Sequence, residues 1–249
     1  MAYDVVVIGS GPGGYPAAIR ASQLGFKVAI IEKESLGGIC LNWGCIPTKA
    51  LLKSAQVYEY MKHSTAYGIS AANVQHDFGG VIKRSRGVAD KMSKGVQFLM
   101  KKNKIDVIMG YGKVKAKGQI EVTAADGTKK TVETKYIILA TGGRSRELPN
   151  LKQDGKKVIG YREAMVLPEQ PKSMIVVGSG AIGVEFAYFY NSMGTKVTIV
   201  EFLPRIVPVE DEDISKELEK SFKKQGIKIM TNASVEKVDT SGTGVKAMV

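Results

Sequence analysis

Short runs of consecutive apolar, mostly β-branched residues recur along the chain, and four of them form two similar pairs. Residues 5–8 and 175–177 each end at a glycine-rich stretch that is followed by a helical pattern. Residues 28–31 and 197–200 come next, and each run ends at an acidic residue. Unbroken apolar runs of this length are typical of strands buried on both faces of a parallel sheet. The pattern therefore predicts two strand–turn–helix–strand units.

Further periodic segments lie between these units. Helices are expected over 45–61 and, with an amphipathic pattern, over 78–102. Shorter strands are expected at 105–109, 119–122, 131–133 and 136–140, with a hairpin turn at Asp126-Gly127. This order of helices and strands predicts the α/β class, organised as two Rossmann-like dinucleotide-binding domains.

The two units are copies of one another. Residues 3–33 and 172–202 align without a gap, and every matched position is 169 residues from its counterpart. The matches include a G-x-G-x-x-G motif and a closing acid: Gly9 with Gly178, Gly11 with Gly180, Gly14 with Gly183 and Glu32 with Glu201. One such motif alone is weak evidence, but two in the same context indicate a repeated dinucleotide-binding unit.

Each position of the motif has a physical role. The first glycine permits the tight turn, the second lets the backbone approach a pyrophosphate, and the third lets the helix pack on the strand. The helix N-terminus offers N–H groups to the phosphates, and the acid accepts a hydrogen bond from a ribose hydroxyl. Glycines that serve βαβ packing alone are the alternative. We expect Glu201 to favour NAD over NADP, with Arg205 as the nearby cation that would weaken this preference.

Two cysteines follow the first unit directly, in residues 37–49 (GGICLNWGCIPTK). Cys40 and Cys45 are expected near the carboxyl end of the sheet, with Cys45 at a helix start, where the dipole and Lys49 favour a thiolate. Two structural thiols are the alternative. A redox-active pair exchanges two electrons, as a nicotinamide does, and a flavin is the natural relay between them. This chemistry assigns FAD to the first dinucleotide site and a nicotinamide to the second.

The charge of the 249 residues is unevenly distributed. The net charge is +12, and residues 1–150 carry 22 basic and 11 acidic side chains. The basic run 83–104 indicates either a surface for nucleic acid or an acidic partner, or a solvated helix face; without a nucleic-acid-binding motif, we favour the solvated face. No secretory signal or membrane-length apolar run is visible, so we expect a cytoplasmic protein without membrane or nucleic-acid partners. Two cysteines are too few for a four-ligand zinc site, and no metal site is expected.

The cysteine segment resembles a known family. Residues 37–52 (GGICLNWGCIPTKALL) are similar to the flavin-dependent pyridine nucleotide–disulfide oxidoreductases, and the similarity covers the whole chain, including Gly110-Tyr111-Gly112 and Ala140-Thr141-Gly142. Within that family, the segment is most similar to the dihydrolipoamide dehydrogenases, whereas glutathione and mercuric reductases share the cysteine spacing but resemble it less. The resemblance implies that electrons pass from dihydrolipoamide through a Cys40–Cys45 disulfide and FAD to NAD.

The resemblance also implies a role for each matched position. Cys45 would lie against the flavin as the charge-transfer thiolate, and Cys40 would be the interchange thiol. Lys49 would lie near the flavin and pair with Glu185 beside the nicotinamide site. FAD would be held by Gly9, Gly11, Gly14, Glu32, Lys49, Gly112, Thr141 and Gly142, and NAD by Gly178, Gly180, Gly183 and Glu201.

Members of this family are nearly twice as long as this chain. The resemblance therefore implies an incomplete FAD-binding domain over 1–150, a truncated NAD-binding domain over 151–249 and no C-terminal dimerisation domain, which in the family supplies a catalytic His–Glu pair. His63 and His76 lie in no such motif, and both are expected at the surface.

These expectations extend to partners and activity. The full-length protein would be a homodimer that serves a lipoyl-bearing subunit of a 2-oxo acid dehydrogenase complex or of the glycine cleavage system. The 249 residues alone would be inactive toward dihydrolipoamide. The alternatives are a family member that reduces a small disulfide or a metal ion, and a non-catalytic flavin-binding module, against which the intact cysteine segment argues.

Overall fold

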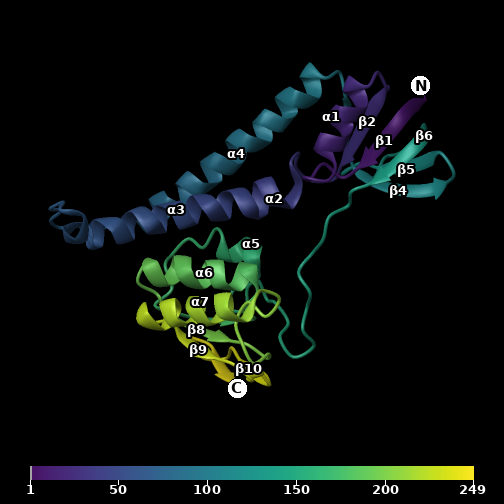
Figure 1. Ribbon diagram of the computed structural model, residues 1–249. Helices are drawn as coiled ribbons and strands as arrows, with labels where there is room; N and C mark the ends of the chain where they lie inside the picture. Colours follow the sequence, from purple (N-terminus) through teal and green to yellow (C-terminus); the bar gives the residue numbers. More distant parts are fainter. Residues whose placement is uncertain (1) are drawn as a thin grey trace. The chain divides into compact units, whose positions relative to one another are not determined.

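The computed structural model describes residues 2–249, which form two compact units (Figure 1). The first unit contains the residues up to Pro47 together with Arg86–Arg144, and the second contains Thr48–Ser85 and Ser145–Val249. Because Thr48–Ser85 packs with the second unit, the compact units do not follow the continuous ranges 1–150 and 151–249. The assignment of those ranges to FAD and NAD stays a prediction.

A six-stranded mixed sheet forms the centre of the first unit, in the order β3-β2-β1-β6-β5-β4. The parallel part consists of β1 (Tyr3–Ile8), β2 (Val28–Glu32), β3 (Asp106–Met109) and the end of β6 (Lys129–Leu139). The antiparallel part consists of β4 (Tyr111–Ala116), β5 (Gln119–Thr123) and the start of β6. The parallel order 3-2-1 is that of a Rossmann half, so the predicted α/β class is confirmed.

Both faces of the central parallel strands β1 and β2 are covered. Val5 and Val7 pack with α1 (Tyr15–Gln23) and with Val96 of α4 (Phe78–Lys102) on one face. Val6 packs with Ile120 and other residues of the antiparallel strands on the opposite face. Successive side chains of a strand point to opposite faces, so a strand covered on both sides is apolar throughout. This explains the unbroken apolar runs at 5–8 and 28–31. In the second repeat, Ile175 and Val177 are 41% and 37% exposed, so the expected burial on both faces is wrong for the run 175–177.

The second unit repeats the strand–helix–strand arrangement on a smaller sheet. Its parallel strands are β7 (Ser173–Val177), β8 (Lys196–Val200) and β9 (Lys228–Met230), in that order, connected by α6 (Ala181–Ser192) and α7 (Glu212–Lys224). A separate hairpin consists of β10 (Lys237–Asp239) and β11 (Lys246–Met248). Phe189 and Tyr190 of α6 lie in its core, and the Tyr190 hydroxyl donates to the Ala164 carbonyl of α5 (Tyr161–Ala164).

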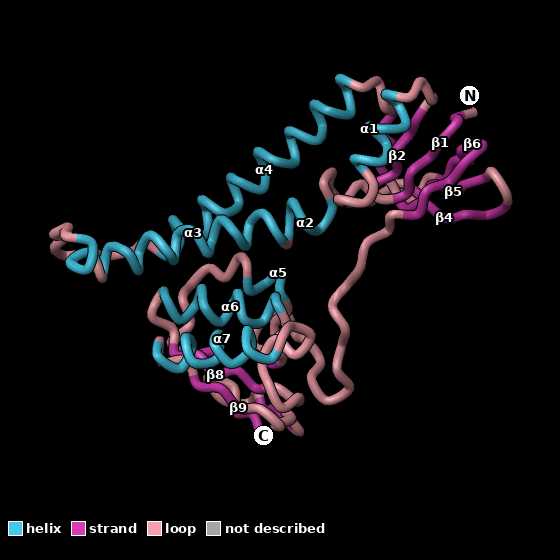
Figure 2. Tube along the Cα trace, viewed as in Figure 1, coloured by secondary structure: helices cyan, strands magenta, loops and turns pink. Residues whose placement is uncertain are grey.

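The segment between the two repeats differs from prediction in its short elements. Helices α3 (Cys45–Lys62) and α4 match the expected 45–61 and 78–102, and a 3-10 helix, η1 (Ser64–Tyr67), follows α3. An unpredicted helix, α2 (Gly38–Trp43), carries Cys40. The prediction of two separate strands at 131–133 and 136–140 is wrong, because β6 runs through both, and β4 was not predicted. After the second repeat, α7, β9, β10 and β11 were not predicted either. Figure 2 shows residues 140–160 as a connection whose only pairing is an isolated bridge between Leu148 and Leu151.

Candidate active site

The first glycine-rich turn lies between β1 and α1. Gly9 has a φ of +98°, and a Cβ there would lie 2.2 Å from the carbonyl oxygen of Ala140. Its N–H donates to the carbonyl oxygen of Ile31 over 2.8 Å. A Cβ on Gly14 would lie 1.9 Å from the carbonyl oxygen of Gly9. Both positions require glycine because neighbouring backbone leaves no room for a side chain.

The second turn repeats this geometry between β7 and α6. Gly178 has a φ of +94°, and its N–H donates to the Val200 carbonyl over 2.8 Å. A Cβ on Gly183 would lie 2.1 Å from the carbonyl oxygen of Gly178, whereas a Cβ on Gly180 would meet no heavy atom within 4 Å. Packing within the protein therefore does not demand glycine at position 180. A pyrophosphate bound close to the start of α6 would require glycine there, so these residues fit a dinucleotide.

A buried acid ends the second strand of each copy. Glu32 and Glu201 each accept hydrogen bonds from the N–H and the hydroxyl of the serine after the first glycine, Ser10 or Ser179. Burial raises the pKa of Glu201, but hydrogen bonds from Ser179 and from the backbone of Leu203 outweigh it, so the pKa is lowered overall. Sequence reasoning missed these serines, although their identity in both copies was a visible signal.

The cysteine segment packs directly on the first turn. Gly37 and Gly38 have left-handed φ values of +94° and +59°, and the Gly37 N–H donates to the Ser10 carbonyl over 3.1 Å. A Cβ on Gly38 would lie 2.7 Å from the Cα of Gly11. The two glycines let α2 begin in contact with the first glycine-rich turn. Cys40 lies near the start of this helix.

Gly44 separates α2 from α3. A Cβ on Gly44 would lie 3.1 Å from the carbonyl oxygen of Ile39 and 3.3 Å from the Cα of Cys40. The chain therefore returns to Cys40 one residue before Cys45. Cys45 is exposed and is the first residue of α3, whereas Cys40 is half-buried. The Cys45 sulfur therefore lies at the positive end of the α3 helix dipole.

Polar contacts hold α2 in place from the side of α4. The buried Asn42 amide donates to the carbonyls of Leu36 and Gly38 over 3.0 and 2.9 Å. Arg86 of α4 donates to the Asn42 carbonyl over 2.6 Å, and its guanidinium lies 4.4 Å from the centroid of the Trp43 ring. Burial lowers the pKa of Arg86, but an arginine remains charged at neutral pH. These supporting contacts were not predicted from the sequence.

Lys49 and Glu185 meet within the second unit. Lys49 lies on α3, one turn after Cys45, and its ammonium group forms an ion pair with the Glu185 carboxylate of α6. The lysine side chain is 62% exposed and the glutamate 28%. Exposed pairs of this kind contribute about 0–1 kcal/mol to stability. The structure thus brings together the two residues that the resemblance pairs, and their catalytic roles stay predictions.

Three further predicted flavin-site residues lie in the first unit. A Cβ on Gly112 would lie 3.2 Å from side-chain methyl carbons of both Ile8 and Ile31, so this glycine lies over the ends of β1 and β2. Thr141 and Gly142 follow β6 and are exposed. Gly112 is therefore close to the strand ends from which the first turn begins, as a dinucleotide site requires.

The two histidines differ from one another. His63 is exposed, as expected. The surface prediction is wrong for His76, which is half-buried, packs edge-on against Tyr58 and hydrogen-bonds Gln170 over 2.9 Å. A partner amide and an aromatic ring stabilise the imidazole there without any motif visible in the sequence.

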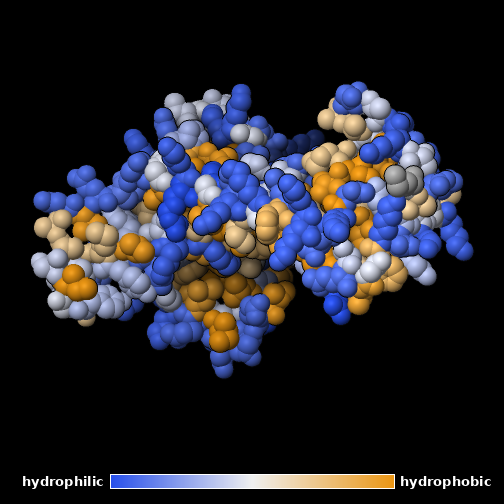
Figure 3. All heavy atoms as spheres, turned by 90° about the horizontal axis from the view of Figure 1, so that it is seen from above, coloured by the Kyte–Doolittle hydropathy of each residue, from blue (hydrophilic) through white to orange (hydrophobic). Residues whose placement is uncertain are grey.

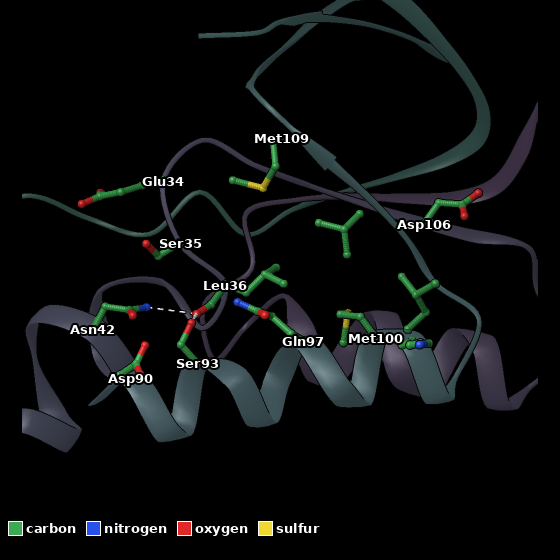
Figure 4. A pocket seen from close by; sticks show the side chains of 13 residues that line it. Glu34, Ser35, Leu36, Asn42, Asp90, Ser93, Gln97, Met100, Asp106 and Met109 are labelled. Atoms are coloured by element: carbon green, nitrogen blue, oxygen red, sulfur yellow. Dashed lines mark hydrogen bonds between the residues drawn. The ribbon is translucent and has the colours of Figure 1, made fainter. Parts of the chain in front are cut away.

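A cavity of ≈ 630 Å³ lies in the first unit between the residues after β2, the edge strand β3 and α4. Figure 4 shows Glu34 and Met109 on one side of it and Ser93 and Met100 of α4 on the other. The described residues that line it include neither cysteine and none of the motif glycines. The cavity is therefore separate from the glycine turn.

The surface mixes apolar and hydrophilic side chains, as the face drawn in Figure 3 shows. Large apolar residues are exposed beside the strand ends of both copies, among them Leu139 at 66% and Phe202 at 73%. Apolar side chains with a few polar groups are typical of ligand sites.

Within residues 2–249, no helix combines the length and the apolar character needed to cross a bilayer.

The chain is similar to known proteins over nearly its whole length. A family model described as pyridine nucleotide-disulphide oxidoreductase matches residues 3–249. A dihydrolipoyl dehydrogenase of Chlorobaculum tepidum is 50% identical over 98% of this chain and 52% of its own, and one of Zymomonas mobilis is 48% identical over 98% and 53%. A crystal structure of LpdA from Mycobacterium tuberculosis has a TM-score of 0.91 at 29% identity, over 98% of this chain and 55% of that one. The chain spans about half the length of the curated relatives it matches.

Proposed function

Because this chain belongs to the pyridine nucleotide-disulphide oxidoreductase family, we propose that it carries the FAD-binding, NAD-binding and cysteine-bearing part of a dihydrolipoyl dehydrogenase. The family match over residues 3–249 confirms the resemblance to the flavoprotein disulfide oxidoreductases. The proposal concerns the identity of the substrate and the cofactors and the route of electron transfer.

One observation carries this function: the cysteine helix α2 packs on the first glycine-rich turn. The close approach of Gly38 to Gly11 supports a redox pair next to a bound dinucleotide. The starts of α1 and α6, together with Glu32 and Glu201, support two dinucleotide sites rather than one. A single site would leave the second copy without a function.

The proposed reaction exchanges one disulfide for another. FAD, when bound, takes up two electrons from a dithiol and supplies them to NAD. A thiolate of dihydrolipoamide attacks Cys40, which breaks the Cys40–Cys45 bond, forms a mixed disulfide and releases the Cys45 thiolate. The second substrate thiolate then attacks the mixed disulfide, which releases oxidised lipoamide and the Cys40 thiolate. Return of the pair to the disulfide gives up two electrons, so that each cycle yields one NADH.

Other residues would bind the two dinucleotides or stabilise the charge of a cysteine thiolate. Gly11 and Gly180 would let each pyrophosphate approach the N–H groups at a helix start, and the strand-end acids would bind ribose. Gly112, Thr141 and Gly142 would complete the FAD site. Lys49, held by Glu185 and one turn after Cys45, would favour the Cys45 thiolate.

The setting of this activity belongs to the proposal as well. The full-length protein would act in the cytoplasm as a homodimer. Its partner would be the lipoyl-bearing subunit of a 2-oxo acid dehydrogenase complex or of the glycine cleavage system. The dihydrolipoyl dehydrogenase relatives, at 48% and 50% identity, support this choice of partner.

The test is an anaerobic titration of the full-length protein with NADH, followed by alkylation and mass measurement. We expect a yellow protein that gains two alkyl labels, on Cys40 and Cys45, when NADH is added. The Cys40→Ser variant is the control, and its labelling of Cys45 should not depend on NADH. A colourless protein that cannot be reconstituted with FAD, or equal labelling with and without NADH, would contradict the function.

A further inference from the structure

The same hydrogen-bond cluster surrounds the strand-end acid of both repeats. In the first, Oε2 of Glu32 accepts from the N–H of Ser10 over 3.0 Å and from its hydroxyl over 2.6 Å. In the second, Oε2 of Glu201 accepts from the N–H of Ser179 over 2.8 Å and from its hydroxyl over 2.6 Å. Because both repeats contain the same serine–glutamate hydrogen bonds, we infer that both require the carboxylate to be held in the same position.

The other carboxylate oxygen is only partly occupied. Oε1 of Glu32 accepts from the N–H of Glu34 over 2.9 Å, and Oε1 of Glu201 accepts from the N–H of Leu203 over 2.8 Å. A carboxylate oxygen can accept about two hydrogen bonds. Oε2 is therefore saturated by its serine, whereas Oε1 keeps the capacity to accept from a ligand hydroxyl.

Burial makes the serine hydroxyls energetically important. Ser10 and Ser179 are 0% exposed, and Glu32 and Glu201 are only 7% and 6% exposed. A buried carboxylate is unstable unless donors replace the water that it loses. In the second repeat, these donors outweigh desolvation and lower the pKa of Glu201. The serine thus keeps the acid ionised and limits rotation of its carboxylate.

We propose that Ser10 and Ser179 are positioning residues that fix the strand-end glutamate of each repeat, so that Oε1 faces the adenosine ribose of the bound dinucleotide. The proposal rests on the dinucleotide sites of the proposed function. It adds that affinity for the adenosine half depends on a serine hydroxyl that itself need not touch the ligand.

Ser179 offers the cleaner test of the two. The hydroxyl of Ser10 also accepts from the N–H of Gly37 over 3.2 Å, so a change there would also affect the start of α2. Ser192, 2% exposed at the opposite end of α6, provides a matched buried serine as the control.

The experiment measures the dissociation constants of NADH and of reduced nicotinamide mononucleotide, which lacks the adenosine half, on the FAD-loaded full-length protein. We expect Ser179→Ala to weaken the binding of NADH about tenfold, which is the effect of losing one hydrogen bond to a charged group. The affinity for the mononucleotide should not change. Ser179→Thr, which keeps the hydroxyl, should restore most of the affinity. Ser192→Ala should change neither constant.

The pH dependence supplies a second readout. Binding of NADH should weaken as the pH falls through the lowered pKa of Glu201, because the ribose then faces a neutral acid. Loss of the hydroxyl donor raises that pKa, so in Ser179→Ala the fall should begin at a higher pH. A purely structural serine would not move this profile.

Equal losses for both ligands, or an unshifted pH profile, would overturn the positioning role while leaving the NAD site intact. Unchanged NADH affinity in Glu201→Gln would overturn the assignment of the acid itself, and with it this proposal. If Ser179→Ala does not fold, Ser179→Gly, which adds no atoms, replaces it with the same expected results.

Discussion

Gly14 and Gly183 lie where a methyl group would approach a backbone carbonyl oxygen to 1.9 and 2.1 Å. Neither distance can be relieved by a side-chain rotation, because the neighbouring atom belongs to the backbone of the same turn. Gly180 lies in open space on the protein side, and its φ of −65° is accessible to any residue. At the scale of single residues, the motif glycines therefore separate into those needed for folding and those needed for the ligand.

Two alanine variants distinguish these requirements. Gly183→Ala should lower stability by about 1–3 kcal/mol or more, because the helix must move away from the turn. Gly180→Ala should change the free energy of unfolding by no more than about 0.5 kcal/mol. It should weaken the binding of NADH at least tenfold, because its methyl group would meet the pyrophosphate. Thermal unfolding and NADH titration of the FAD-loaded protein provide the two measurements. A destabilised Gly180→Ala variant that binds NADH normally would contradict the interpretation.

The strand-end acid of the second repeat is expected to determine which nicotinamide cofactor is preferred. Glu201 is ionised and accepts hydrogen bonds from its own turn, so it would repel the 2′-phosphate of NADP. We expect kcat/KM to be at least tenfold higher with NADH than with NADPH, and Glu201→Gln to reduce this ratio. Arg205, the nearby cation that would weaken this preference, donates to the Pro208 carbonyl over 3.2 Å. The Arg205→Ala variant is the control that measures its effect on the ratio. Equal efficiency with the two cofactors would contradict the assignment.

At the scale of elements, the two cysteines lie on either side of the junction between α2 and α3. Helix α2 has six residues and begins at a left-handed Gly37 without a side-chain cap. Isolated helices of this length are unstable in water, so its contacts with the first turn and with Arg86 must hold it. Gly44 then lets the chain turn so tightly that the next helix starts beside Cys40.

Gly44→Ala tests this junction. The added methyl group must displace Ile39 or Cys40 by a few tenths of an ångström, because its contacts would be 3.1 and 3.3 Å. We expect slower closure of the Cys40–Cys45 disulfide, measured by alkylation after timed oxidation, with flavin content unchanged. Gly95→Ala, on the exposed side of α4 with no atom within 4 Å, is the matched control. Equal closure rates in the two variants would show that the tight turn is not required.

At the scale of the whole molecule, each compact unit has its own sheet and its own core. One core consists of residues that flank the parallel strands of the first unit, and another surrounds α6 in the second. Each unit also has one glycine turn with its acid. A ligand that binds one turn should therefore stabilise that unit selectively, because binding lowers only the free energy of the state it binds.

Hydrogen exchange with single ligands measures this selectivity. FAD at about 100 times its dissociation constant should add about 2.7 kcal/mol to protection of the bound unit, and the slowed amides should lie in β1, α1 and β2. NADH added to the FAD-loaded protein should slow amides of β7, α6 and β8. The hairpin β10–β11 serves as an internal reference. If FAD alone slowed amide exchange in β1 and in β7 equally, the result would contradict separate sites.

Much of the fold was predictable because its signals are local. Buried parallel strands need continuous apolar residues, and a tight turn before a helix needs glycine at fixed spacing, so the repeat could be read from the order of residues alone. The class, the strands of both copies, the long helices and the cysteine segment follow from such signals. Lys49 and Glu185 lie 136 positions apart. Their pairing was predicted through resemblance to a family, not through any local pattern.

The tertiary structure decided what depends on contacts between distant residues. Helix α2 exists because Gly37 and Gly38 pack on Ser10 and Gly11, about 27 positions earlier, and no propensity of six residues would predict it. The hydrogen bonds from Ser10 to Glu32 depend on a strand returning beside the turn, and the half-buried state of His76 depends on Gln170. Sequence patterns report which face a residue turns inward, whereas hydrogen-bond partners are selected only when separate segments come together in space.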